Sequence, residues 1–107
     1  MKKMRILLDL DNTVFFYSKK SGKVKEHPKL KYLLDNYDVI LFSGRDDIKD
    51  FADKWNVGYI WKGEESEASA DYLIDDLCKQ WLPMVKVKKG YSSINRFLLD
   101  IKRKKKK

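Results

Sequence analysis

The sequence is poor in cysteine and has no long apolar run, and each lack excludes a class of protein. Only one of the 107 residues is a cysteine, Cys78. An internal disulfide is therefore impossible, and the thiolate spacing of a zinc finger is missing. No apolar run approaches the ~20 residues of a membrane-spanning helix. With two prolines and five glycines, no stretch is typical of a linker. These absences favour a cytoplasmic protein of one domain.

What the chain does have is enough apolar side chain for one core. Hydrophobic residues make up 43% and aromatic residues 13% of the sequence, far more than in a disordered chain. The net charge is +8, but six of the positive charges lie in residues 102–107. We predict a single domain over residues 1–101, followed by a basic, disordered tail at residues 102–107.

Short apolar runs that end in polar residues recur along the chain, and they predict parallel strands. The four clearest are Arg5–Asp11, Asp38–Gly44, Val57–Trp61 and Asp71–Asp75, with a fifth, shorter one at Met84–Lys88. Helical spacing lies between or after them, at 28–36, 46–55 and 94–101. The alternation predicts an open, Rossmann-like parallel α/β sheet of about five strands, with helices on both faces and ligands at the carboxyl ends of the strands.

One segment departs from this alternation. Residues 14–26 have the pattern of a β-hairpin with its turn near Ser21 and Gly22. Its aromatic residues would overhang the first strand and could form a lid over a site there. The single histidine, His27, is expected at the surface and is given no role.

Two carboxylates, Asp9 and Asp11, lie at the end of the first predicted strand. Residues two apart on a strand point the same way, and adjacent carboxylates repel unless a cation lies between them. Mg²⁺ fits best, because it takes a few protein oxygens and completes its shell with water and phosphate oxygens. The pair therefore predicts a magnesium site.

The pattern Asp9-x-Asp11-x-Thr13 after an apolar strand resembles the first motif of the haloacid dehalogenase (HAD) superfamily. The resemblance implies that Asp9 attacks phosphorus and forms an aspartyl-phosphate. It implies that Asp11 protonates the leaving oxygen and then activates the hydrolytic water, and that Thr13 helps to bind phosphate. Ion-pumping ATPases of the family carry Thr in place of the second Asp, and its dehalogenases lack that Asp, so hydrolysis of a phosphate ester is favoured.

Two further segments resemble the phosphate-binding motifs of the family. Ser43, at the end of the second predicted strand, matches the hydroxyl that binds a phosphoryl oxygen. Gly44 and Arg45 follow it and would assist, together with backbone N–H groups of the turn. Lys62 is the best match for the lysine that neutralises the nucleophile and the phosphoryl group, and Lys54 is the alternative.

The pair Asp75-Asp76 resembles the last motif, which holds the metal. The resemblance implies that Asp9 and Asp75 each give Mg²⁺ a carboxylate oxygen, that Asp11 gives its backbone carbonyl, and that Asp76 holds a metal-bound water.

Taken together, the motifs imply a Mg²⁺-dependent HAD-type phosphatase. The segments between the motifs leave no room for a cap domain, so the site would be open to large substrates. A phosphomonoester on a nucleic-acid end or a nucleotide is the expected substrate, with the tail slightly favouring a polynucleotide. Two alternatives stay open: a non-catalytic binding or regulatory module with this fold, and a nucleic-acid-binding protein that works through its basic tail.

Overall fold

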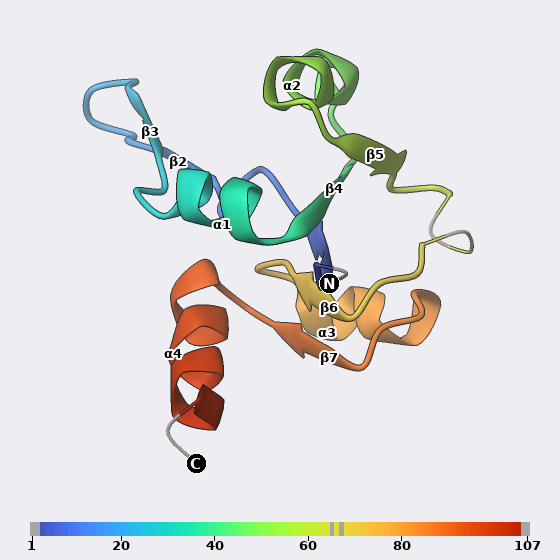
Figure 1. The fold of residues 1–107 in the computed structure, drawn as a ribbon. Helices are drawn as coiled ribbons and strands as arrows, with labels where there is room; N and C mark the ends of the chain where they lie inside the picture. Colours follow the sequence, from blue (N-terminus) through green and yellow to red (C-terminus); the bar gives the residue numbers. More distant parts are fainter. Residues whose placement is uncertain (1–2, 65, 67, 106–107) are drawn as a thin grey trace.

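The computed structural model describes residues 3–64, 66 and 68–105 and contains both strands and helices (Figure 1). The strands are β1 (Arg5–Leu8), β2 (Phe15–Tyr17), β3 (Val24–Glu26), β4 (Asp38–Ser43), β5 (Gly58–Trp61), β6 (Tyr72–Ile74) and β7 (Lys89–Tyr91). The helices are α1 (Leu30–Asn36), α2 (Ile48–Trp55), α3 (Cys78–Trp81), the 3₁₀ helix η2 (Leu82–Met84) and α4 (Ile94–Lys105). Among the described residues, no helix has both the length and the apolar character needed to cross a membrane.

Five of the strands form one parallel sheet in the order β5-β4-β1-β6-β7. The central strand β1 pairs on both sides, with Leu8 opposite Leu41 of β4 and Ile74 of β6. Because the strands are parallel, their carboxyl ends meet at one edge. The predicted open parallel α/β sheet is confirmed.

Helices cover both faces of this sheet. Successive side chains of a strand point to opposite faces, so the apolar strands present an apolar surface on each side. Ile6 and Leu8 of β1 belong to a core cluster with the buried faces of α1, α2 and α4. Leu7, between them in sequence, belongs to a second cluster with Cys78 of α3, against which Trp81 packs. The layers that were expected on both faces are therefore present.

The strand predicted at residues 84–88 is wrong, because the fifth strand of the sheet is Lys89–Tyr91. The segment before it begins with η2, and Val85 is buried in the second core cluster instead of pairing in the sheet. The later register places Tyr91 beside Ile74 and buries its ring against Phe97. This position buries the large aromatic ring of Tyr91 between the sheet and α4.

The prediction of a disordered tail at residues 102–107 is also wrong for residues 102–105, because α4 continues to Lys105. Lysine and arginine are good helix formers, and positive charge is favourable near a helix C-terminus. Residues 106 and 107 lie outside the described residues.

The predicted hairpin is present as the antiparallel pair β2–β3, with Gly22 at a φ of 67° in its turn. The surface position predicted for His27 is wrong, because the ring is only 9% exposed. Its Nδ1 accepts a hydrogen bond from the backbone N–H of Lys29 (3.0 Å), which leaves Nε2 as the donor to Asn95 Oδ1 (3.0 Å). This bond ties the start of α1 to α4.

We expect Phe97→Ala to lower the free energy of unfolding by about 3–5 kcal/mol. The ring is fully buried and contacts the rings of Tyr37, Tyr72 and Tyr91, so truncation leaves a cavity where α4 meets the sheet. Urea unfolding measures the loss. Leu99→Ala, at a half-exposed position of the same helix, is the matched control and should cost about 0.5 kcal/mol or less. Equal losses in the two variants would contradict this packing.

Candidate active site

The carboxyl ends of four neighbouring strands bring their polar residues together. Asp9 follows β1, Ser43 ends β4, Lys62 follows β5 and Asp75 follows β6. Residues from these ends and their loops surround an open concavity of about 470 Å³, lined by Asp9, Asp11, Asn12, Ser43, Gly44, Arg45, Asp46, Lys62, Asp76 and Leu77. A larger concavity of about 920 Å³ lies at the opposite edge, around Arg5, Asp38 and Asp71, and none of the predicted site residues lines it.

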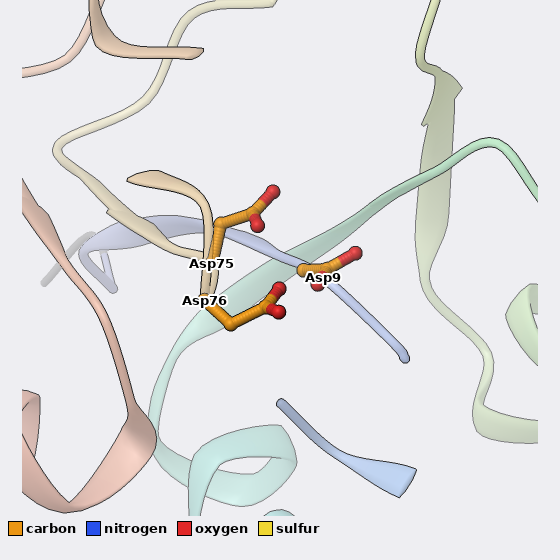
Figure 2. Close-up of side chains that lie close together, drawn as sticks. All are labelled: Asp9, Asp75 and Asp76. Carbon is orange, nitrogen blue, oxygen red and sulfur yellow. The ribbon is translucent and has the colours of Figure 1, made fainter. Parts of the chain in front are cut away.

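Three carboxylates form the centre of the site (Figure 2). Oxygens of Asp9, Asp75 and Asp76 all lie within 4.8 Å of one another. Asp9 is 4% exposed and Asp75 is fully buried, whereas Asp76 is exposed. The backbone N–H of Asp9 donates to the carbonyl of Ile74 (2.9 Å), which fixes the two strand ends side by side. Such a cluster of hard oxygens can hold a metal ion.

Lys62 is the counter-ion of the buried pair. Its Nζ lies 3.0 Å from Asp9 Oδ1 and 2.7 Å from Asp75 Oδ2. The ammonium also lies 5.4 Å from the ring centroid of Phe42 and 5.1 Å from that of Trp81, which limits its freedom. Lys54, the alternative, is exposed on α2 and does not line the concavity.

Burial strongly perturbs these carboxyl groups. Burial and the neighbouring Asp75 raise the pKa of Asp9 to about 7, although Lys62 opposes the shift. Burial likewise raises the pKa of Asp75, again against the effect of Lys62. The pair holds more negative charge than one ammonium can offset, so it favours either a bound proton or a further cation.

Thr13 connects Asp9, at the end of β1, with Asp76 in the loop after β6. Its hydroxyl donates to Asp9 Oδ2 (3.1 Å) and accepts from the backbone N–H of Asp76 (3.2 Å). Thr13 is 1% exposed and does not line the concavity, so here it supports Asp9, and the phosphate-binding role expected for it stays a prediction. The tight turn that turns Thr13 back toward Asp9 includes Asn12 at a φ of 62°, a left-handed conformation that asparagine tolerates better than most residues.

Ser43 and Gly44 lie where the sequence places them, on the wall of the concavity. Ser43 Oγ accepts a hydrogen bond from the backbone N–H of Arg45 (3.2 Å), so its hydroxyl proton remains available as a donor. A Cβ on Gly44 would lie 4.0 Å from Lys62 Cβ, an ordinary contact, so space alone does not demand glycine here.

Arg45 is engaged by the protein itself. Its Nε and Nη2 donate to the two carboxylate oxygens of Asp47 (2.7 and 2.9 Å), and its Nη1 donates to Asp11 Oδ1 (2.6 Å). The guanidinium lies over the rings of Phe15 and Phe51. Arg45 therefore orients Asp11, and its role in binding phosphate, which the resemblance implies, stays a prediction.

Tyr17 of the hairpin joins the same cluster, and its contribution was missed at the sequence level. Its hydroxyl donates to Asp11 Oδ1 (2.6 Å) and accepts from Arg45 Nη1 (2.5 Å). The hydrogen bond to Asp11 raises the pKa of Tyr17, so the hydroxyl stays protonated. The only sequence signal was an aromatic residue in a hairpin that follows the first motif.

The hydrogen bonding of the buried Asp75 carboxylate shows whether this residue has an oxygen free to bind a metal ion. Asp75 Oδ1 accepts from the backbone N–H of Leu77 (2.9 Å). Asp75 Oδ2 has an ion-pair contact with Lys62 but, among the described residues, no partner at hydrogen-bonding geometry. A buried acceptor with spare capacity, facing two further carboxylates, fits a divalent cation. The carboxylate of Asp11 points to Arg45 instead and is not part of this cluster.

Comparisons of the chain with protein-family models, with curated proteins and with solved structures found no match. The interpretation of this site therefore rests on its own geometry and chemistry.

We expect the protein without added metal to lose stability as pH rises from about 4 to about 7, by roughly 1–3 kcal/mol from the buried pair. In this range the folded state retains a proton on the pair, whereas the unfolded chain has released it, so each rise in pH favours unfolding. Mg²⁺ should offset the charge and stabilise the protein more at high pH than at low pH.

Thermal unfolding at several pH values, with Mg²⁺ or EDTA, measures both effects. Asp9→Asn is the control that removes the titrating charge and should flatten the profile. Identical profiles for wild type and variant would contradict the assignment of the shift to this pair.

Proposed function

We propose that the protein is a Mg²⁺-dependent phosphohydrolase of the HAD type, which cleaves a phosphomonoester through an aspartyl-phosphate. One observation carries the proposal: Asp9 and Asp75, buried at adjacent strand ends, share the ammonium of Lys62. A buried pair of acids beside a single cation lowers the stability of the folded protein. Such a cost is typical of functional sites, where a bound ligand offsets the charge. A phosphate with a divalent cation is the ligand that such a set of charges suits.

In the proposed reaction Asp9 is the nucleophile. Thr13 holds one carboxylate oxygen and Lys62 the other, which orients the group and limits its motion. An oxygen of Asp9 attacks phosphorus and forms the acyl-phosphate bond, while the bond from phosphorus to the ester oxygen breaks. Asp11 gives its proton to that leaving oxygen, so the first product is a neutral alcohol.

The second half of the reaction reverses the role of Asp11. Its carboxylate takes a proton from a water molecule, and the water oxygen attacks phosphorus. The acyl-phosphate bond breaks, which releases inorganic phosphate and restores the carboxylate of Asp9. Tyr17 and Arg45 hold Asp11 at the mouth of the concavity, where it can reach both the leaving oxygen and the water.

Lys62 and Ser43 are suited to bind the transferring phosphoryl group. The ammonium of Lys62 offsets negative charge on the nucleophile and on phosphate, and the Ser43 hydroxyl can donate to a phosphoryl oxygen. Asp9, Asp75 and Asp76 would hold Mg²⁺. When bound, this ion would neutralise charge on the phosphoryl oxygens and lower the repulsion that the nucleophile meets.

The open concavity supports a substrate larger than a free phosphate, such as a nucleic-acid end or a nucleotide. The proposal includes a cytoplasmic location, which the single thiol of Cys78 supports.

We expect Asp9→Asn to lower the turnover of an aryl phosphate by at least about a thousandfold, because it removes the nucleophile while keeping the shape of the side chain. Phosphate release with Mg²⁺ measures the activity, and EDTA should abolish it. Asp35→Asn, an exposed position of α1, is the matched control and should leave turnover unchanged. A wild type without turnover that still binds Mg²⁺ would favour the non-catalytic module instead.

We expect Tyr17→Phe to lower kcat about fivefold with little change in KM, because one hydrogen bond to Asp11 contributes about 1 kcal/mol. Steady-state kinetics on the aryl phosphate measure both constants. Tyr59→Phe, an exposed tyrosine of β5, is the control. A change in KM alone would show that Tyr17 acts on substrate binding and not on the positioning of Asp11.

A further inference from the structure

A second concavity lies along the outer edge of the sheet, beside β7. It has a volume of about 350 Å³ and lies between α3 and α4, with its walls formed by Cys78, Lys79, Lys89, Gly90, Tyr91, Ser92, Arg96, Leu99, Asp100 and Arg103. β7 is the last strand of the sheet, so no further strand from the described part of the chain covers this side. We call this feature the β7 groove.

The β7 groove is strongly basic. Four of its side chains are cationic and only Asp100 is acidic. Asp100 is already occupied, since it accepts the hydroxyl of Tyr91 and pairs with Lys89 (3.3 Å) and Lys104 (3.7 Å). The other three cations of the groove are exposed and have no acidic partner among the described residues; they are Lys79, Arg96 and Arg103.

The arrangement of these cations suits a chain with repeated negative charges. Arg96 and Arg103 are two helical turns apart on one side of α4, a rise of about 10 Å, and Lys79 faces them from α3. A polynucleotide carries a phosphate at each residue, so its successive phosphates can match cations that are spread along the groove. The one aromatic ring of the groove, Tyr91, is 6% exposed, so it offers bases no stacking surface. The groove would therefore contact phosphates without reading sequence.

The β7 groove begins where the active site ends. Asp76 and Leu77 line the active-site concavity, and the next two residues, Cys78 and Lys79, line the groove. The active-site lining itself has more acids than bases: Asp9, Asp11, Asp46 and Asp76 against Arg45 and Lys62. A polyanion thus gains little attraction at the reacting centre, and the groove can supply it.

We infer that the β7 groove binds the phosphate backbone of a single-stranded polynucleotide whose terminal phosphate enters the active site. The inference rests on the proposed phosphohydrolase function, which it narrows to one class of substrate. The terminal phosphate is hydrolysed at Asp9, while phosphates farther along the strand contact Arg96, Arg103 and Lys79.

The test measures binding separately from chemistry. Asp9→Asn protein is titrated with short single-stranded DNA that carries a terminal phosphate, at several salt concentrations and with Mg²⁺. The groove variant adds Lys79→Gln, Arg96→Gln and Arg103→Gln. The matched control adds Lys29→Gln, Lys31→Gln and Lys49→Gln, which removes the same charge from exposed positions directly before α1, within α1 and on α2. Turnover of an aryl phosphate is measured with Asp9 restored in both sets.

We expect the groove variant to bind DNA roughly tenfold more weakly, with a log–log salt slope less steep by about 2, since each single-strand phosphate contact contributes about 0.7. The control should bind as the parent does, and both sets should keep aryl phosphate turnover. Equal losses in groove variant and control, or equally good competition by polyglutamate, would overturn the inference. Groove-dependent DNA binding without any turnover by the wild type would overturn only the proposed hydrolysis.

Discussion

The ion cluster of Asp9, Asp75 and Lys62 is the interaction on which the rest of the site depends. Removing charges from water costs several kcal/mol per ion, and one ammonium between two carboxylates cannot recover all of it. The sheet tolerates this cost because the strand ends beneath the cluster are well packed, with Leu8 and Ile74 fully buried side by side. The cluster thus holds an excess of negative charge at a point where the packed backbone cannot move. A divalent cation can offset this charge, and the cation can in turn bind a phosphate.

Around this centre, hydrogen bonds connect the loops that would take part in chemistry. Thr13 joins the loop after β1 to the loop after β6, and Arg45 joins the loop after β4 to Asp11. Tyr17 extends the second connection to the hairpin, so the hairpin cannot shift without disturbing Asp11. Residues far apart in sequence therefore act as one unit. In this unit Thr13 supports Asp9, and Arg45 supports Asp11.

Charge is divided unevenly over the carboxyl edge of the sheet. Acidic side chains gather around the reacting centre, whereas the β7 groove beside it is basic. This division follows from the strand order, because β7 is an edge strand and the cationic residues of α3 and α4 line the groove along it. The positive charges of Lys102, Arg103 and Lys104 are held on α4, which gives them a defined position that a disordered tail would lack.

The sequence alone was sufficient for the parallel α/β sheet, the hairpin and most of the residues that meet at the site. Apolar runs mark buried strands, and a polar residue directly after such a run must lie at the carboxyl edge, so Asp9, Ser43, Lys62 and Asp75 could be found by pattern. Local pattern failed for β7, for His27 and for α3, whose four residues are too few to show a period.

Only the tertiary structure placed Lys62, and not Lys54, beside Asp9 and Asp75. It also brought Thr13 to Asp9, and Arg45 and Tyr17 to Asp11. These outcomes depend on where side chains from separate elements point and on which buried groups they must satisfy. Hydrogen bonds and ion pairs between distant segments form only after the sheet has brought those segments together, and so they leave no periodic trace in the chain.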